Sequence, residues 1–321
     1  MIVHEFVNGN KPCMILIHGV LTPWQIWTPQ IDAFIDKYNV YVIALNAHTE
    51  EVESEFVSLT EESEKIIQYF EKNNIDNIDV LCGISLGGKI AHCIWKSFRL
   101  NINNLILDGA PLVSCPKFAI NIMIKNYKDI IHKSKKRDPK VITNFKKHFL
   151  PEKYLNNYLK IADLFTDESI ENIVNSAFGV GEIKGGDAGS RILYMYGTKA
   201  NEMLSKKSAR LIKKYYPTAC VVCFKGDAHC YKATYEPEKW IAVVKSFLEE
   251  NKEQMYTTLR ELCAIPAPSH LEHERAAYCK EWLERVGAEG VYIDDATQQF
   301  TIDNKVVVQF AAYSEIKLYY K

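Results

Sequence analysis

The sequence has no apolar run that approaches the roughly 20 residues needed to span a membrane. Its opening segment, MIVHEFVNGNKP, has no cationic stretch followed by an apolar one, so we expect no secretory signal. Charge of one sign is also lacking, because 39 lysines and arginines offset 40 aspartates and glutamates and leave a net charge of −1. These absences argue against a membrane-spanning protein and against a general affinity for nucleic acid or an anionic membrane.

The cysteine and histidine patterns of disulfide frameworks and metal sites are also missing. The nine cysteines are odd in number and lie mostly within apolar runs, so we expect a reducing, cytoplasmic protein. Cys220 and Cys223 form a C-x-x-C, but ACVVCF is a β-rich apolar run without a second ligand pair. We therefore expect both thiols in the core. No H-x-H or H-E-x-x-H spacing occurs in residues 1–250, and no metal or other cofactor is indicated.

Short, continuous apolar runs alternate with helical patterns through the first 250 residues. Such runs suit strands that are buried on both faces of a parallel sheet. They cover residues 13–19, 40–48, 79–85, 104–111, 191–198 and 220–229. The helical patterns cover residues 59–74, with a cap expected at Thr60, and residues 86–98, 205–216 and 236–250. The alternation predicts a doubly wound α/β sheet whose strands are mostly parallel.

Residues 114–189 interrupt this alternation with helical patterns alone, such as FAINIMIKNYKDIIHK. We therefore expect a helical cap insertion within a domain that spans residues 1–250. The insertion carries a basic cluster, HKSKKRDPK, which offers a site for an anion or an acidic partner. A solvated turn between two helices explains such a charge run more simply.

Gly83-Ile84-Ser85-Leu86-Gly87 fits the pattern G-x-S-x-G, and it stands where a predicted strand meets a predicted helix. A serine on so sharp a turn is strained, and side chains at the flanking glycines would collide with the neighbouring strand and helix. The turn exposes the Ser85 hydroxyl above the sheet edge. It also directs the Leu86 N–H, at the start of the helix, toward an oxyanion that develops beside the serine.

Two histidines follow predicted strands and extend the pattern. His18-Gly19 ends the run ILIHG, where a loop can supply a second N–H, that of Val20, to the same oxyanion. The alternative is that His18 only caps the strand. His229 follows the last strand run, in GDAHC. A free serine is a poor nucleophile and requires an imidazole, such as that of His229, to accept its proton.

With HGV, GISLGG and GDAHC at these places, residues 1–250 resemble the α/β-hydrolase family, and the helical insertion lies where many members carry a lid. The resemblance is greatest to the small esterase, lipase and acyl-hydrolase branch. It implies an α/β-hydrolase fold with Ser85 as the nucleophile, His229 as the base, and the N–H groups of Val20 and Leu86 as oxyanion donors. The substrate implied is a small-molecule ester or a related acyl compound.

The third member of the triad is ambiguous in the sequence. Family members usually carry the acid in a G-x-x-D pattern after the strand that RILYMYGT represents, but here Ala200 takes that position. Glu202 lies two residues further on and reaches His229 if the loop bulges. Asp108 ends the run NLILD and is the alternative, since the preceding strand can also supply the acid. If neither serves, the imidazole is poorly oriented and the chemistry slows without necessarily being abolished.

The expected substrate pocket is partly apolar. Its candidate residues are His18 and Trp24 beside the oxyanion loop, and Phe118 and Met123 in the insertion. Trp24 is equally suited to packing, and His48 is a further candidate for the pocket wall. The leading hypothesis is a serine hydrolase that forms an acyl-enzyme. The alternative from another class is a catalytically idle ligand-binding or scaffold protein on the same fold.

Residues 251–321 differ in character from the rest. The stretch MYTTLRELCAIPAPSHLEHERAAYCKEWLERVGAEG resembles the N-terminal edge of M20-type metallopeptidases. The residues that match that outline are Pro266, Pro268, Ser269, Glu272, Trp282, Leu283 and Gly287. That family continues into a His-x-Asp pair, where this sequence reads Ala312-Tyr313-Ser314-Glu315, and tyrosine cannot replace the imidazole. We expect a truncated, small α/β appendage without peptidase activity. A dimerising or capping module is the alternative.

Overall fold

The computed structural model describes residues 1–50, 52–179, 181, 185–186, 189–199, 202–249, 273–285, 292–294, 299–302, 305–310 and 316–318. The chain divides into two compact units, Met1–Phe247 and Leu248–Lys321. Every candidate residue for catalysis or substrate binding belongs to the first unit.

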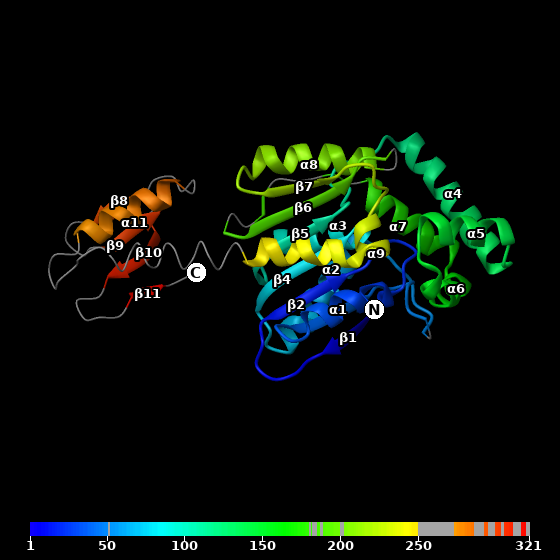
Figure 1. Cartoon of the computed structure of the whole chain (residues 1–321), viewed down its shortest axis with the longest axis horizontal. Coiled ribbons are helices and arrows are strands. Elements are labelled where there is room, and N and C mark those ends of the chain that lie inside the picture. The colour runs from blue at the N-terminus through cyan, green and yellow to red at the C-terminus, as the bar shows by residue number, and fades with distance from the viewer. Residues whose placement is uncertain are drawn as a thin grey trace. The chain divides into compact units, whose positions relative to one another are not determined.

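A seven-stranded sheet forms the centre of the first unit, with its strands in the order β1-β3-β2-β4-β5-β6-β7 (Figure 1). The strands are β1 (Ile2–Phe6), β2 (Cys13–Ile17), β3 (Asn39–Ala44), β4 (Asn77–Ile84), β5 (Asn101–Asp108), β6 (Arg191–Gly197) and β7 (Cys220–Phe224). Strands β2 to β7 are the predicted ones, and all pairings among them are parallel. The prediction of a mostly parallel α/β sheet is confirmed.

Strand β1 is the element that the sequence pattern did not reveal. It lies at the edge of the sheet and pairs antiparallel with β3, from Ile2 opposite Ala44 to Phe6 opposite Val40. All of its side chains are at least partly exposed, so it has no continuous apolar run. The apolar-run pattern identifies strands that are buried on both faces, so it does not identify this edge strand.

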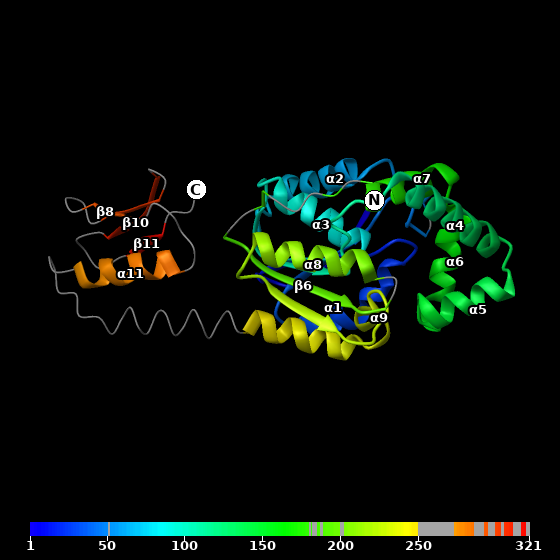
Figure 2. The ribbon, with the colours of Figure 1, turned by 90° about the horizontal axis from the view of Figure 1, so that it is seen from above.

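Helices cover both faces of this sheet. They are the short 3-10 helix η1 (Trp24–Trp27), α1 (Thr28–Phe34), α2 (Leu59–Lys72), α3 (Leu86–Lys96), α8 (Met203–Tyr215), α9 (Tyr231–Tyr235) and the helical residues 237–249. Helices α2 and α3 lie on one face, while α1 and the helical residues 237–249 lie on the other (Figure 2). Helix α8 packs along β6 and β7. Each predicted helix is thus present in this unit.

Helix α2 begins before the predicted cap. Its N-cap residue is Ser58, whose hydroxyl accepts a hydrogen bond from the Glu61 N–H at 3.1 Å. Thr60 lies inside the first turn instead. Leu59 is buried and belongs to the apolar face of the helix, so the helix has to start ahead of it.

The parallel register brings the carboxyl ends of the central strands to a common edge. Ile17 of β2 lies opposite Gly83 of β4, and Ile84 of β4 lies opposite Asp108 of β5. All side chains of β2 and β3 are buried, so this edge is part of a close-packed core. The loops after these strands meet at that edge, which is where open α/β sheets carry their sites.

The insertion between β5 and β6 is helical and gathers beyond one end of the sheet (Figures 1 and 2). It contains α4 (Lys117–Lys135), α5 (Pro139–His148), η2 (Glu152–Tyr154), α6 (Leu155–Leu164) and α7 (Asp167–Gly179). Its basic cluster is engaged in surface ion pairs. Lys133 Nζ lies 2.6 Å from Asp129 Oδ2, and Arg137 Nη1 lies 2.7 Å from Asp163 Oδ1. These pairs favour the simpler interpretation of the cluster as a solvated surface.

Cys220 and Cys223 are exposed, and the expectation that both belong to the core is wrong. They lie on β7, the last strand in the order of the sheet. The apolar run identified a strand correctly, but its composition did not reveal that the strand lies at an edge.

The second unit contains a helix and a small sheet. Helix α11 (His273–Arg285) precedes a four-stranded antiparallel sheet in the order β11-β10-β9-β8. Its strands are β8 (Tyr292–Asp294), β9 (Gln299–Ile302), β10 (Lys305–Phe310) and β11 (Ile316–Leu318). The positions that carry the metallopeptidase resemblance at Pro266, Pro268, Ser269, Glu272 and Gly287, and the segment 312–315, lie outside the described residues. That resemblance stays a prediction.

Among the residues that the structure describes, no helix is long and apolar enough to cross a membrane.

Candidate active site

Ser85 occupies the turn between β4 and α3 in a strained backbone conformation, with φ 51° and ψ −115°. Residues other than glycine rarely adopt a positive φ, and such strain persists only where the surroundings impose it. The Ser85 N–H donates to the Asp108 carbonyl at 2.8 Å, and the Ser85 carbonyl accepts from the Lys89 N–H at 3.2 Å. Strand β5 and helix α3 therefore hold the turn from both sides, while the serine side chain stays partly exposed.

The glycines on either side of Ser85 are required because backbone atoms occupy the space beside them. A Cβ on Gly83 would lie 2.2 Å from the Gly87 carbonyl oxygen. A Cβ on Gly87 would lie 2.3 Å from the carbonyl oxygen of Ile17, in the adjacent strand β2. Main-chain atoms of a central strand and of a helix cannot yield as a flexible side chain can. The steric reason predicted for the two glycines is confirmed.

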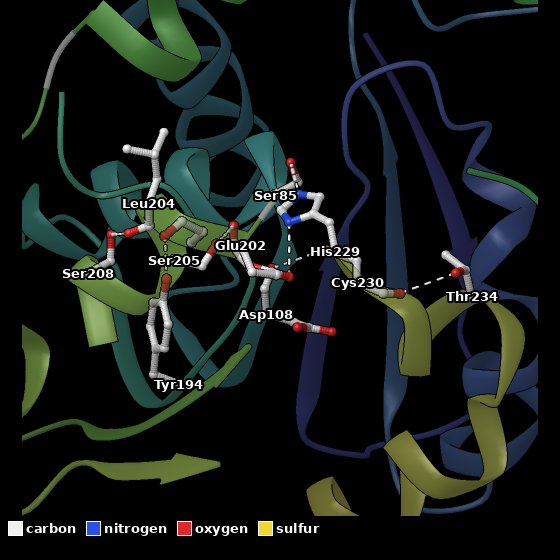
Figure 3. Close-up of polar contacts among 12 residues, drawn as sticks. Ser85, Asp108, Tyr194, Glu202, Leu204, Ser205, Ser208, His229, Cys230 and Thr234 are labelled. Atoms are coloured by element: carbon white, nitrogen blue, oxygen red, sulfur yellow. Dashed lines mark hydrogen bonds and ion pairs between the residues drawn. The ribbon is translucent and has the colours of Figure 1, made fainter. Parts of the chain in front are cut away.

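His229 lies between Ser85 and Glu202 (Figure 3). Its Nε2 is 2.9 Å from Ser85 Oγ, and its Nδ1 is 3.1 Å from Glu202 Oε1. An ionised carboxylate only accepts hydrogen bonds, so Nδ1 carries the proton and Nε2 is left to accept from the serine hydroxyl. The imidazole comes from the loop between β7 and α9, and the carboxylate comes from the residue before α8.

The loop before α8 brings Glu202 to His229, which was one of the possibilities that the sequence left open. The N–H groups of Thr198 and Lys199 both donate to the Asp227 carbonyl at 3.0 Å, and the Glu202 N–H donates to the Lys199 carbonyl at 2.9 Å. Glu202 thereby becomes the N-cap residue of α8, and its side chain is only 1% exposed. Ala200, at the position where the family pattern places the acid, lies outside the described residues.

Burial and charge act in opposite directions on the pKa values of this pair. Burial would lower the pKa of His229, but the hydrogen bond to Glu202 and its charge, followed by the charge of Asp108, raise that pKa above its ordinary value. Burial would raise the pKa of Glu202, but the hydrogen bond and charge of His229, together with hydrogen bonds from Ser205 and Gly197, outweigh it, and the pKa of Glu202 is lowered. The pair therefore combines an ionised carboxylate with an imidazole that readily accepts a proton.

Asp108, the alternative acid, is also buried, but its carboxylate has a different partner. Asp108 Oδ2 accepts a hydrogen bond from the Trp240 indole N–H at 3.1 Å. Burial, and then the charge of Glu202, raises the pKa of Asp108 to about 7. The geometry pairs Glu202 with the imidazole and Asp108 with the indole. The sequence does not indicate this contact, because Trp240 simply fits the apolar pattern of the last helix.

The loop after β2 lies against Ser85. A Cβ built on Gly19 would be 3.2 Å from the Ser85 Cβ, so the next N–H along the chain, that of Val20, is in the immediate vicinity of the serine. Among the described residues, none accepts a hydrogen bond from the Val20 N–H. The Leu86 N–H lies in the first turn of α3, where N–H groups have no partner within the helix.

Two of the predicted pocket residues, His18 and Trp24, have defined partners within the first unit, and their role in a pocket stays a prediction. His18 is fully buried, its Nδ1 bonds the Gly19 carbonyl at 2.8 Å, and its Nε2 accepts the Leu45 N–H at 3.1 Å. Burial lowers the pKa of His18 to about 4, so it is a neutral support of the loop. Trp24 stacks on His4 of β1, with ring centroids 4.1 Å apart. Strands β3 and β2 separate β1 from the strand that leads to Ser85.

The other two predicted pocket residues, Phe118 and Met123, lie on α4 of the cap. Phe118 is 69% exposed, and Met123 is partly exposed. Their role in a pocket stays a prediction.

The fold matches known hydrolases, although the sequence is distant from them. A scan of protein-family models and a search of curated proteins find no match. Among solved structures, a putative α/β hydrolase family protein from Desulfitobacterium hafniense is 20% identical with a TM-score of 0.59, over 77% of this chain and 99% of that one. An esterase from a marine microorganism is 19% identical with a TM-score of 0.60, over 77% of this chain and 98% of that one.

A third structure extends the likeness. A thermophilic esterase from Thermogutta terrifontis is 17% identical with a TM-score of 0.56, over 78% of this chain and 93% of that one. The chain therefore has the α/β-hydrolase fold, as its motifs predicted. At these identities the likeness establishes the fold alone.

Proposed function

We propose that this chain is a serine hydrolase that cleaves a carboxylic ester, or a related acyl bond, of a small and partly apolar substrate. The observation that carries the proposal is the continuous contact from Ser85 through His229 to Glu202. The two distances are 2.9 Å and 3.1 Å, and the carboxylate at the far end is buried. A scaffold or ligand-binding protein has no need of a strained serine joined to an oriented imidazole.

The first half of the reaction forms an acyl-enzyme. Ser85 Oγ attacks the carbonyl carbon of the ester while His229 Nε2 takes the hydroxyl proton. Glu202 stabilises the resulting imidazolium through the hydrogen bond at Nδ1. The carbonyl oxygen becomes an oxyanion, which the N–H groups of Val20 and Leu86 stabilise. The intermediate then collapses, the bond to the alcohol breaks, and His229 returns the proton to the leaving oxygen.

The second half releases the acid. Water attacks the acyl carbon as His229 Nε2 takes one of its protons, and the same N–H groups stabilise the second oxyanion. Collapse of this intermediate breaks the bond to Ser85 Oγ, which receives the proton from His229. The products are a carboxylic acid and an alcohol, and the serine is regenerated. No step requires a metal or a redox cofactor.

The test of this proposal is covalent labelling combined with turnover. The wild-type chain should react with a fluorophosphonate probe and hydrolyse short p-nitrophenyl esters, and Ser85→Ala should do neither while folding normally. Ser114→Ala, which changes an exposed serine at the start of the cap, is the matched control and should keep both activities. An unlabelled wild-type protein would instead support the idle ligand-binding alternative.

We also propose that residues 251–321 form an appendage that the hydrolase chemistry does not require. All residues assigned to the reaction lie within Met1–Phe247, one of the two compact units. A chain without residues 252–321 should stay soluble and keep its ester turnover, measured with the same p-nitrophenyl substrates. The full chain should gain no peptidase activity from added zinc or cobalt. Loss of folding or turnover on truncation would show the appendage to be an integral element.

A further inference from the structure

The loop that carries the Val20 N–H contains a residue in an unfavourable conformation. Leu21, the next residue, has a φ of 56°, in the left-handed region that side chains with a Cβ rarely occupy. The conformation of Leu21 determines how the peptide units of this loop are oriented. A contact with a residue outside the loop is therefore needed to hold Leu21 in this conformation, so that the Val20 N–H keeps its direction.

The group that holds Leu21 is the imidazole of His48. The Leu21 N–H donates to His48 Nε2 at 3.1 Å, across 27 residues of sequence. His48 Nδ1 lies 3.1 Å from the Asn46 carbonyl oxygen, which only accepts, so Nδ1 is the protonated nitrogen and Nε2 the acceptor. Burial lowers the pKa of His48 well below its ordinary value, which keeps the ring neutral and able to accept.

The His48 ring is itself fixed on two sides. It is 0% exposed, and its centroid lies 4.8 Å from that of His18 and 4.9 Å from that of Phe165. Phe165 directly follows α6 of the cap, and its ring meets the imidazole edge to face. His18 in turn bonds the Gly19 carbonyl at the start of the same loop. The imidazole of His48 thus connects the cap to the loop beside Ser85.

We propose that His48 is a positioning residue for the oxyanion site: by accepting the Leu21 N–H, it fixes the orientation in which the loop presents the Val20 N–H to the substrate oxygen. It touches neither substrate nor the reacting atoms. This inference rests on the proposed serine-hydrolase function and assigns to His48 a role different from the pocket wall suggested by its sequence position.

If His48 has this role, replacing it should weaken the stabilisation of the transition state without weakening substrate binding. His48→Phe keeps an aromatic ring but removes the acceptor for the Leu21 N–H. Loss of a single oxyanion donor lowers kcat by about 10²–10³-fold, and displacement of a donor should cost less, about 10- to 100-fold. The KM for p-nitrophenyl acetate should stay within about 2-fold, since oxyanion contacts form mainly in the transition state. Affinity for an alkyl boronic acid, which forms a tetrahedral adduct with Ser85, should fall in parallel with kcat.

Two further variants separate positioning from packing. His48→Gln retains a side-chain acceptor that can reach the Leu21 N–H and should recover most of the lost kcat, whereas the shorter His48→Asn should not. This pair also serves if His48→Phe does not fold. His92→Phe removes another buried imidazole, from α3, and is the control, with kcat near that of the wild type.

The outcomes distinguish this inference from the proposed function. Equal kcat values for His48→Gln and His48→Asn, or a wild-type kcat in His48→Phe, would overturn the role of His48 while leaving the hydrolase intact. A loss of kcat that matches the loss of folded protein, with the boronic-acid affinity of the folded fraction unchanged, would also overturn it. A wild-type chain that neither reacts with fluorophosphonate nor hydrolyses esters would overturn both proposals.

Discussion

The turn at Ser85 and the surface of the helical cap differ in the kind of contact that their residues make. Backbone atoms surround the turn so closely that a single added carbon on Gly87 would lie 2.3 Å from the Ile17 carbonyl oxygen. The cap instead carries surface pairs such as Arg137 with Asp163, in which both side chains are 45% exposed. Close-packed backbone tolerates almost no change, whereas exposed pairs contribute little individually. The proposed chemistry is therefore fixed by main-chain packing, whereas the exposed positions of the cap can vary residue by residue.

The largest expected effect distinguishes the two buried carboxylates at the sheet edge. Glu202→Gln should lower kcat by about 10⁴-fold, because a neutral amide can stabilise neither the required tautomer of His229 nor its imidazolium. Asp108→Asn should reduce kcat far less, since Asp108 is paired with Trp240. Steady-state kinetics with p-nitrophenyl acetate measures both. A large loss in Asp108→Asn with a mild one in Glu202→Gln would transfer the role of the acid to Asp108.

The next effect tests the contrast between the turn and the cap directly. Gly87→Ala should destabilise the protein by about 3 kcal/mol or more, at or beyond the upper end of ordinary overpacking, because the clash is with backbone. Gly179→Ala, at the end of cap helix α7, would bring its Cβ only within 3.8 Å of Ile120 Cδ1 and should be nearly neutral. Urea denaturation of both variants measures the difference. Similar free energies of unfolding would remove the distinction drawn between the two regions.

A smaller effect concerns pH. His229 must be neutral to accept the serine proton, so kcat/KM should rise with pH through the pKa of His229, which lies above the ordinary value for an imidazole. Asp108, with its pKa of about 7, gains negative charge over the same range and raises the pKa of His229 further. The rise of kcat/KM on the acidic side of the pH–rate profile should therefore be gradual. In Asp108→Asn it should become steeper and shift to lower pH in a pH–rate profile, and a shift to higher pH would contradict this electrostatic account.

The smallest effect is expected in the cap. Arg137→Ala should lower stability by less than about 1 kcal/mol, because the bidentate pair with Asp163 is exposed to water on both sides. A double-mutant cycle with Asp163→Ala, followed by urea denaturation, isolates the pair. Turnover should be unchanged. A coupling energy of several kcal/mol would mean that the cap is held as rigidly as the turn.

The sequence predicted those parts of the fold that depend on local pattern. Continuous apolar runs identified strands β2 to β7, and the glycines around Ser85 marked the turn because only glycine fits against the backbone there. Strand β1 was missed because its side chains are all partly exposed. Cys220 and Cys223 were assigned to the core because composition does not tell an edge strand from a central one.

The site residues show the same limit. Ser85 and His229 follow strands closely, so their places were set by strand ends that the sequence reveals. The choice between Glu202 and Asp108 depended on the path of a loop, which Asp227 fixes by accepting two N–H groups from across the sheet edge. The contact of Trp24 with His4 depended likewise on packing between separate elements. Local pattern contains no information on such contacts.

The indole of Trp240 has a consequence for how the protein is made. It contacts the ring of Trp27 at a centroid distance of 5.6 Å and bonds Asp108, 132 residues earlier in the chain. Gln30 similarly donates to the carbonyl of Ala233, 203 residues later. Contacts so distant in sequence form only after the intervening chain has been synthesised. A nascent chain still attached to the ribosome before its last helix emerges has Ser85 but not the completed sheet edge, so the proposed activity would require translation of the whole first unit.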